Sequence, residues 1–230
     1  MYRHFERELE LLKRELIRMG SLVEEQIAHS LEALERDDDA LAGRVKETDI
    51  EVDAMEIAID KRIERLLALN QPVAVDLRLL IAALKMNNDL ERMGDQARNI
   101  AEHVIQIQGV PGELINRMQI RQMADLASRM VRDSLNAFIY QDVSLAYGVL
   151  EQDDMVDQLH QQAYRIGAAY MREKPEDIEN CLHMLSVAKN LERIADLATN
   201  IAEDVVFLVE ARIIKHQGRL ESRPDSGHGN

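Results

Sequence analysis

Apolar residues recur at steps of three and four along most of the chain, which is the period of an amphipathic helix. The pattern runs through Leu9, Leu12, Leu16, Met19, Val23, Ile27, Leu31 and Leu34, and again through Val52, Met55, Ile59, Ile63 and Leu66. The alternation typical of strands is almost absent. The sequence therefore predicts an all-α protein.

Helix breakers divide this pattern into six long segments. The four prolines, at 72, 111, 175 and 224, each stand where the apolar pattern pauses, and the run Asp37–Asp39 marks another reversal, where an Asp can cap the next helix. Helices are expected over about residues 3–36, 39–70, 72–109, 114–141, 143–173 and 176–215. Helices of roughly twice the mean globular length favour elongated antiparallel bundles.

An internal repeat organises the six helices. Residues 90–104 (LERMGDQARNIAEHV) and 191–205 (LERIADLATNIAEDV) are identical at ten of fifteen positions, with an offset of 101 residues. Upstream, Asp49 and Asp53 align with Asp153 and Asp157. We therefore expect two tandem antiparallel three-helix bundles related by internal duplication, over residues 1–110 and 111–215, followed by a disordered tail at 216–230.

The amino-acid composition excludes several classes of binding partner. The 230 residues include 42 Asp and Glu against 28 Lys and Arg, a net charge of −14, which argues against nucleic acid or an anionic membrane as the main partner. With 3 Phe, 5 Tyr and no Trp, few side chains could stack on bases or sugars. The single cysteine, Cys181, and the absence of a signal-like or membrane-spanning apolar run lead us to expect a cytoplasmic protein.

Carboxylate pairs are the strongest chemical signal in the sequence. Each unit has two helices on which two acids lie four residues apart, so that both side chains point the same way. Like charges at that spacing repel by roughly 0.2–0.5 kcal/mol, whereas hard cations such as Mg²⁺, Ca²⁺, Mn²⁺ or Fe³⁺ prefer several carboxylate oxygens. The pairs are Asp49/Asp53, Glu91/Asp95, Asp153/Asp157 and Glu192/Asp196, and Asn99, Glu102, Asn200 and Glu203 continue the same column. We predict one metal site per unit from these twelve residues, aided by small Gly94, Ala97 and Ala101, which let the neighbouring helix approach closely.

Two other interpretations stay open at this point. The acids could form a solvated helix face, neutralised by the adjacent Arg92 and Arg193 without any metal. A dimetal carboxylate enzyme would need Glu-x-x-His on two helices, but Asp157-x-x-His160 has no counterpart in the first unit. The histidines His29, His103, His160 and His183 are scattered singly, and the pattern favours surface positions or inter-helix hydrogen bonding over metal ligation for them. We assign no catalytic or cofactor-binding residues and expect no enzyme.

The repeated motif resembles the PhoU family of phosphate-transport regulators. The resemblance rests on the duplicated Leu-Glu-Arg-(Ile/Met)-(Gly/Ala)-Asp-x-Ala-x-Asn-Ile-Ala-Glu run, on residues 77–85 before its first copy and on the paired acids, and it covers about residues 1–215. It implies a cytoplasmic homodimer with multinuclear metal clusters on the acidic pairs, of divalent or ferric ions (Fe, Zn, Mg or Mn). It also implies a negative regulator of the phosphate-starvation response and of phosphate uptake, coupling the ATP-binding subunit of a phosphate ABC importer to a sensor histidine kinase, without membrane insertion.

Overall fold

The computed structural model describes residues 2–109 and 112–211, and within these ranges every regular element is helical. No helix in these ranges is both long and apolar enough to cross a membrane. The elements are α1 (Tyr2–Arg36), α2 (Asp39–Asn70), α3 (Val75–Gln106), α4 (Gly112–Arg117), α5 (Ile120–Tyr140), α6 (Val143–Glu173), the 3₁₀ turn η1 (Pro175–Asp177) and α7 (Ile178–Glu210).

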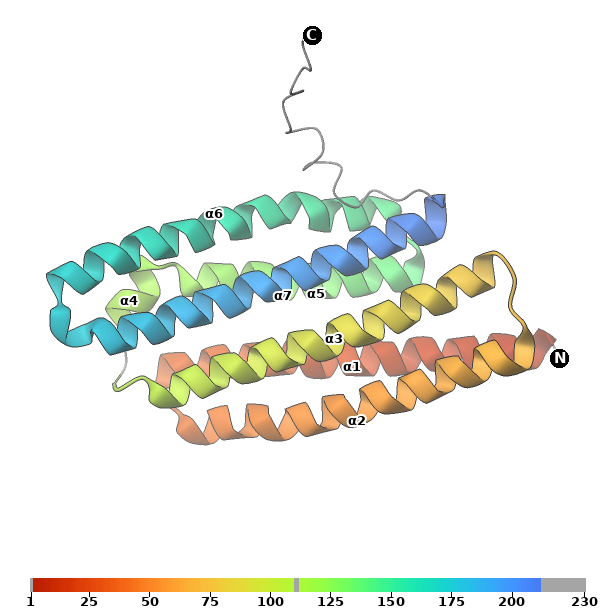
Figure 1. Ribbon diagram of the computed structural model, residues 1–230, viewed down its shortest axis with the longest axis horizontal. Helices are drawn as coiled ribbons and strands as arrows, with labels where there is room; N and C mark the ends of the chain where they lie inside the picture. Colours follow the sequence, from red (N-terminus) through yellow and green to blue (C-terminus); the bar gives the residue numbers. More distant parts are fainter. Residues whose placement is uncertain (1, 110–111, 212–230) are drawn as a thin grey trace, which may run out of the picture.

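The long helices form two three-helix units that lie against each other along their length (Figure 1). Within the first unit α1, α2 and α3 pack together, and within the second α5, α6 and α7 do. Between the units α3 packs on α7 and α1 on α5, so that α1, α3, α5 and α7 are the inner helices while α2 and α6 lie outside. The buried apolar residues form one continuous core. The predicted fold class, an all-α pair of three-helix bundles, is confirmed.

Helix ends follow the local chemistry that the sequence indicates. The side chain of Asp38 accepts a hydrogen bond from the backbone N–H of Leu41 at 2.9 Å, and Asp142 accepts one from Leu145 at 3.1 Å. Each aspartate therefore caps the N-terminus of the helix that follows, α2 or α6.

Three predicted boundaries need correction. The helix expected over 114–141 is divided into α4 and α5, because Gln119 has a φ of 55°, which a right-handed helix does not contain. The third helix begins at Val75 rather than at Pro72, because Gln71 and Ala74 also have positive φ values. The last begins with a 3₁₀ turn, and its predicted end at 215 and the tail at 216–230 lie outside the described residues.

Close helix approach occurs beside the predicted acidic site. A Cβ atom placed on Gly94 would lie 3.0 Å from Oε1 of Gln26 and 3.5 Å from Oδ1 of Asp49. Ala97 and Ala101 are fully buried on the same helix. The small residues therefore bring α3 close to α1 and α2, as the sequence predicts.

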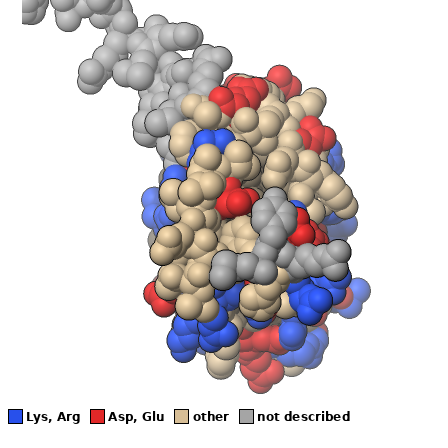
Figure 2. Space-filling view, turned by 90° about the vertical axis from the view of Figure 1, so that its right-hand side faces the viewer, with Lys and Arg blue, Asp and Glu red and all other residues tan. Residues whose placement is uncertain are grey.

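One end of the molecule carries the α2–α3 and α5–α6 turns. Figure 2 shows that most of the described surface at this end is uncharged, with Lys and Arg side chains gathered toward the α2 side. Apolar side chains in the α2–α3 turn are more than half exposed here: Leu69 is 70% exposed, Val73 73% and Val75 54%. The acidic pairs lie farther along the helices.

Candidate functional site

The first acidic cluster consists of Asp49 and Asp53 on α2 and Glu91 and Asp95 on α3. Burial raises the pKa of Glu91 to about 7, and repulsion by Asp95, Glu56 and Asp53 adds to the effect. The pKa of Asp53 is also raised, by desolvation and then by the charges of Asp49 and Asp95. These mutual effects show that the two predicted pairs lie on facing sides of α2 and α3, close enough to repel each other.

An arginine lies inside the first cluster. Arg98 donates to Oδ2 of Asp49 at 2.7 Å and forms an ion pair with Oδ1 of Asp95 at 2.8 Å. Asp49 is only 3% exposed, and Gln26 donates to its other oxygen at 3.2 Å. Arg92, which the sequence suggests as the neutralising residue, instead pairs with Asp89 at 3.2 Å. Arg98 therefore partly neutralises the negative charge of the first cluster.

The second acidic cluster consists of Asp153 and Asp157 on α6 and Glu192 and Asp196 on α7. Burial raises the pKa of Asp153 to about 7, with further repulsion from Asp196 and Asp157. Burial and the same two aspartates raise the pKa of Glu192, while Lys189 and Arg193 oppose the shift. The facing arrangement of the first cluster is thus repeated in the second.

The duplication has not preserved the arginine. The position equivalent to Arg98 is Thr199, whose hydroxyl donates to the backbone carbonyl of Asp196 at 2.7 Å. His160 lies beside this cluster, with Nδ1 4.0 Å from Oε1 of Glu192, and burial lowers its pKa. Its Nε2 is buried and has no hydrogen-bond partner among the described residues. The second cluster therefore combines four acids with a histidine whose pKa is lowered by burial.

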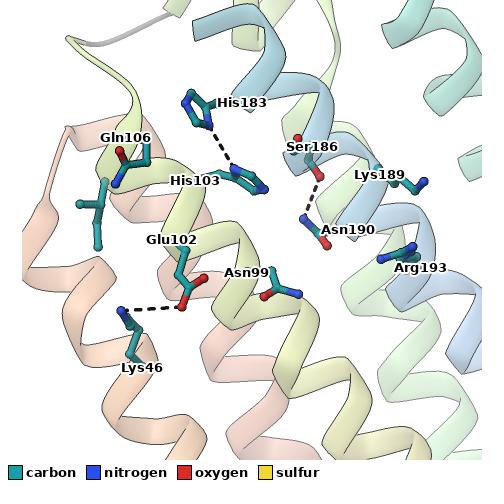
Figure 3. Close-up of a pocket in the computed structure, with 11 residues that line it drawn as sticks. Lys46, Asn99, Glu102, His103, Gln106, His183, Ser186, Lys189, Asn190 and Arg193 are labelled. Carbon is teal, nitrogen blue, oxygen red and sulfur yellow. Dashed lines mark hydrogen bonds and ion pairs between the residues drawn. The ribbon is translucent and has the colours of Figure 1, made fainter. Parts of the chain in front are cut away.

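Three of the other four predicted ligands line pockets between α3 and α7, and Glu102 also helps to raise the pKa of Arg98 in the first cluster. Asn99 and Glu102 line a groove between α3 and α7, where Glu102 lies 3.7 Å from Nζ of Lys46 (Figure 3). Asn200 lines a smaller pocket between the same helices, of about 220 Å³, and Glu203 is half-buried farther along α7. The predicted ligands therefore do not all lie on one side of α3 and α7. The acidic pairs face α2 or α6, whereas Asn99, Glu102 and Asn200 lie at the contact between the two units.

The acids are near one another without surrounding a common point. In the described parts of the chain, no three His, Cys, Asp or Glu side chains converge closely enough to hold a metal ion as they stand. The donor set nevertheless suits a hard cation, because such ions prefer several carboxylate oxygens, and burial and mutual repulsion disfavour the ionised form of Glu91 and Asp153. Rotation of these side chains would be needed to enclose an ion.

Comparison with known proteins shows the family to which this chain belongs. The family model described as the PhoU domain matches residues 16–104 and 120–205, which is one match to each three-helix unit. The chain belongs to the PhoU family. A relative from Aquifex aeolicus, named "Phosphate-specific transport system accessory protein PhoU homolog", is 42% identical over 211 residues, covering 92% of this chain and 95% of the relative. The homolog from Pseudomonas putida carries the same name and is 39% identical over 214 residues, covering 93% of this chain and 84% of its own.

Solved PhoU structures share the fold. The crystal structure of PhoU from Pseudomonas aeruginosa has a TM-score of 0.84 at 37% identity, covering 90% of this chain and all 100% of that one. The PhoU phosphate transport system regulatory protein from Streptococcus pneumoniae also has a TM-score of 0.84, at 31% identity over 91% of this chain and 99% of that one. These PhoU proteins are named as accessory and regulatory proteins, and none of the names describes an enzyme.

Proposed function

We propose that this chain is an accessory protein of a phosphate-specific transport system that regulates phosphate uptake. The observation that carries the proposal is the match to proteins of that name over nearly the whole chain, with 42% identity to the relative from Aquifex aeolicus. The finer role is a cytoplasmic negative regulator: it couples the ATP-binding subunit of a phosphate ABC importer to a sensor histidine kinase and restrains signalling when phosphate is plentiful. The chain acts as a homodimer.

A deletion strain tests the regulatory role. Loss of the gene should leave phosphatase expression high in phosphate-rich medium, and the wild-type gene on a plasmid should restore repression. Unchanged repression in the deletion strain would contradict the proposal. Purification of the tagged chain should recover the kinase and the transporter subunit, and light scattering on the purified chain should give twice the chain mass.

We further propose that the two acidic clusters bind divalent or ferric ions. Asp49, Asp53, Glu91 and Asp95 would hold ions in the first cluster, and Asp153, Asp157, Glu192 and Asp196 in the second. A bound cation supplies the positive charge that offsets repulsion among these carboxylates. The raised pKa values of Glu91 and Asp153 support this role, since burial and neighbouring acids disfavour the ionised form of both groups and a cation would favour it.

The two clusters should differ in cation affinity. Arg98 already supplies a positive charge to the first cluster, whereas Thr199 stands at the equivalent position of the second. Mn²⁺ or Fe²⁺ should therefore bind more tightly at the second cluster. Titration of the chelator-treated chain should show that Asp153→Asn/Asp196→Asn removes the tighter binding and that Asp49→Asn/Asp95→Asn removes only the weaker. Equal retention of metal by both double variants and the wild type would show that the ions bind outside the two clusters and would refute the site assignment.

A further inference from the structure

Two histidines that are 80 residues apart in the sequence meet between the two units. His103 lies near the end of α3 and His183 near the start of α7, and their Nδ1 atoms are 3.1 Å apart (Figure 3). The ring centroids are 5.3 Å apart and the ring planes are tilted by 50°, so the rings meet through their nitrogens rather than by stacking. Neutral rings can share one hydrogen bond here, because one Nδ1 donates and the other accepts.

The separation of these nitrogens also matches two imidazoles on one metal ion. With metal–nitrogen bonds of about 2.0–2.1 Å, two nitrogens lie about 2.9 Å apart at a right angle and about 3.3 Å apart at the tetrahedral angle. The observed 3.1 Å falls between these values. An ion could therefore replace the shared hydrogen with little movement of either helix.

The surroundings leave room for an ion and for water. Both rings are half-buried and line a groove of about 660 Å³ between α3 and α7. Glu102 is adjacent to His103 and adds negative charge, which Lys46 partly balances at 3.7 Å. Lys189 and Arg193 also line the groove, but they lie six and ten residues beyond His183, which is about 9 and 15 Å along the helix axis.

The other end of the same helix contact is held by different chemistry. Lys85 of α3 forms an ion pair with Asp204 of α7 at 3.0 Å. Asp204 is the residue that the 101-residue repeat places in equivalence with His103. The duplication has therefore produced an ion pair at one end of the α3–α7 contact and a histidine pair at the other.

We propose that His103 and His183 form a binding site for a borderline transition metal ion, Zn²⁺ or its spectroscopic substitute Cu²⁺, held through both Nδ1 atoms. Imidazole nitrogen is a preferred ligand for these ions, and water from the groove fills the remaining positions. On binding, the ring that donates loses its Nδ1 proton to water and takes one up at Nε2, so that both rings stay neutral with their protons on Nε2 and no net proton is released. The ion ties α3 to α7 and uses neither acidic cluster, so the site is distinct from the carboxylate sites proposed above.

Electron paramagnetic resonance of the full-length chain with substoichiometric Cu²⁺ tests the site. The wild type should show hyperfine coupling to two nitrogens, and His103→Gln/His183→Gln should lose it and bind Zn²⁺ at least about tenfold more weakly. His160→Gln is the matched control, because it removes the histidine beside the second acidic cluster and should leave the coupling unchanged. Asp153→Asn/Asp196→Asn should leave it unchanged as well, which separates this proposal from the carboxylate sites.

A second measurement needs no variant. Long-range ¹H–¹⁵N spectra of the wild-type imidazoles should show two Nδ1 resonances moving together on addition of Zn²⁺. Two-nitrogen coupling that persists in His103→Gln/His183→Gln, its loss in His160→Gln, or Nδ1 resonances unmoved by Zn²⁺ would each overturn the proposal.

Discussion

Asp49 and Asp153 occupy equivalent positions of the duplication, yet replacing each with asparagine should change stability in opposite directions. Asp49 is buried against Arg98, whereas the charges that act on Asp153 are those of other acids, which together with burial raise its pKa. In metal-free protein at pH 8, Asp153→Asn should stabilise the fold and Asp49→Asn should destabilise it. The replacement of Asp by Asn is thus compared at two equivalent positions that differ in the charges around them.

The magnitude for Asp153 follows from its pKa. The carboxyl has a pKa of about 7 in the folded chain against an ordinary aspartate pKa of 3.8. A difference of about 3 units corresponds to at most about 4 kcal/mol, and solvent around this half-buried group reduces the expected effect to about 1–2 kcal/mol. Because the folded state holds this proton more tightly than the unfolded state, the group's contribution to the free energy of unfolding is fully present below about pH 4. It is lost as the pH rises toward about 7.

Asp153→Asn removes the loss of stability that ionisation of Asp153 causes at high pH, because an amide carries no charge to desolvate. The midpoint of thermal unfolding at pH 8 should rise by about 2–8 °C, and the difference from the wild type should shrink toward pH 4.5. Asp49→Asn leaves Arg98 paired only with Asp95 and should lower the free energy of unfolding by about 1–3 kcal/mol at pH 8.

Circular dichroism melts between pH 4.5 and 8, with chelator present throughout, provide the measurement. A lower melting temperature of Asp153→Asn at pH 8, or an equal effect at both ends of the pH range, would contradict the role given to burial and repulsion at Asp153. A stabilising Asp49→Asn would show that Arg98 does not compensate the first cluster.

Further predictions concern the clusters and the helix contacts. Glu91→Gln should raise the melting temperature of metal-free protein above pH 7 and change it little near pH 4.5, measured by the same melts, because the pKa of Glu91 is raised to about 7. Thr199→Arg should weaken Mn²⁺ binding at the second cluster in a calorimetric titration, and unchanged affinity would contradict the role given to Arg98. Asp142→Ala should cost about 1 kcal/mol in urea unfolding, because the cap on Leu145 is lost. Gly20→Ala should destabilise the α1–α5 contact by no more than about 1 kcal/mol, since the added Cβ would overlap the end of the Leu135 side chain and force it to shift.

The acidic clusters show which features of the site could be predicted from the sequence and which could not. The spacing of Glu91 and Asp95 fixes both side chains on one helix face, and the structure places that face against the Asp49/Asp53 pair. The sequence did not indicate that Arg98 would enter the cluster, because neutralisation of Asp49 depends on how α2 and α3 are rotated about their axes. It also missed the position of His160 beside Glu192, which depends on the packing of α6 against α7.

Local and repeated features were determined by the sequence alone. The 3.6-residue period of apolar positions, the capping aspartates and the fifteen-residue repeat depend on neighbours within a turn or two, so they predict the helices, the duplication and the PhoU family. Only the tertiary structure decided the break at Gln119, the turn of Asn99 and Glu102 toward α7, and the meeting of His103 with His183. Helical periodicity tells which residues share a face, whereas the partner of each face is set by how the two units pack.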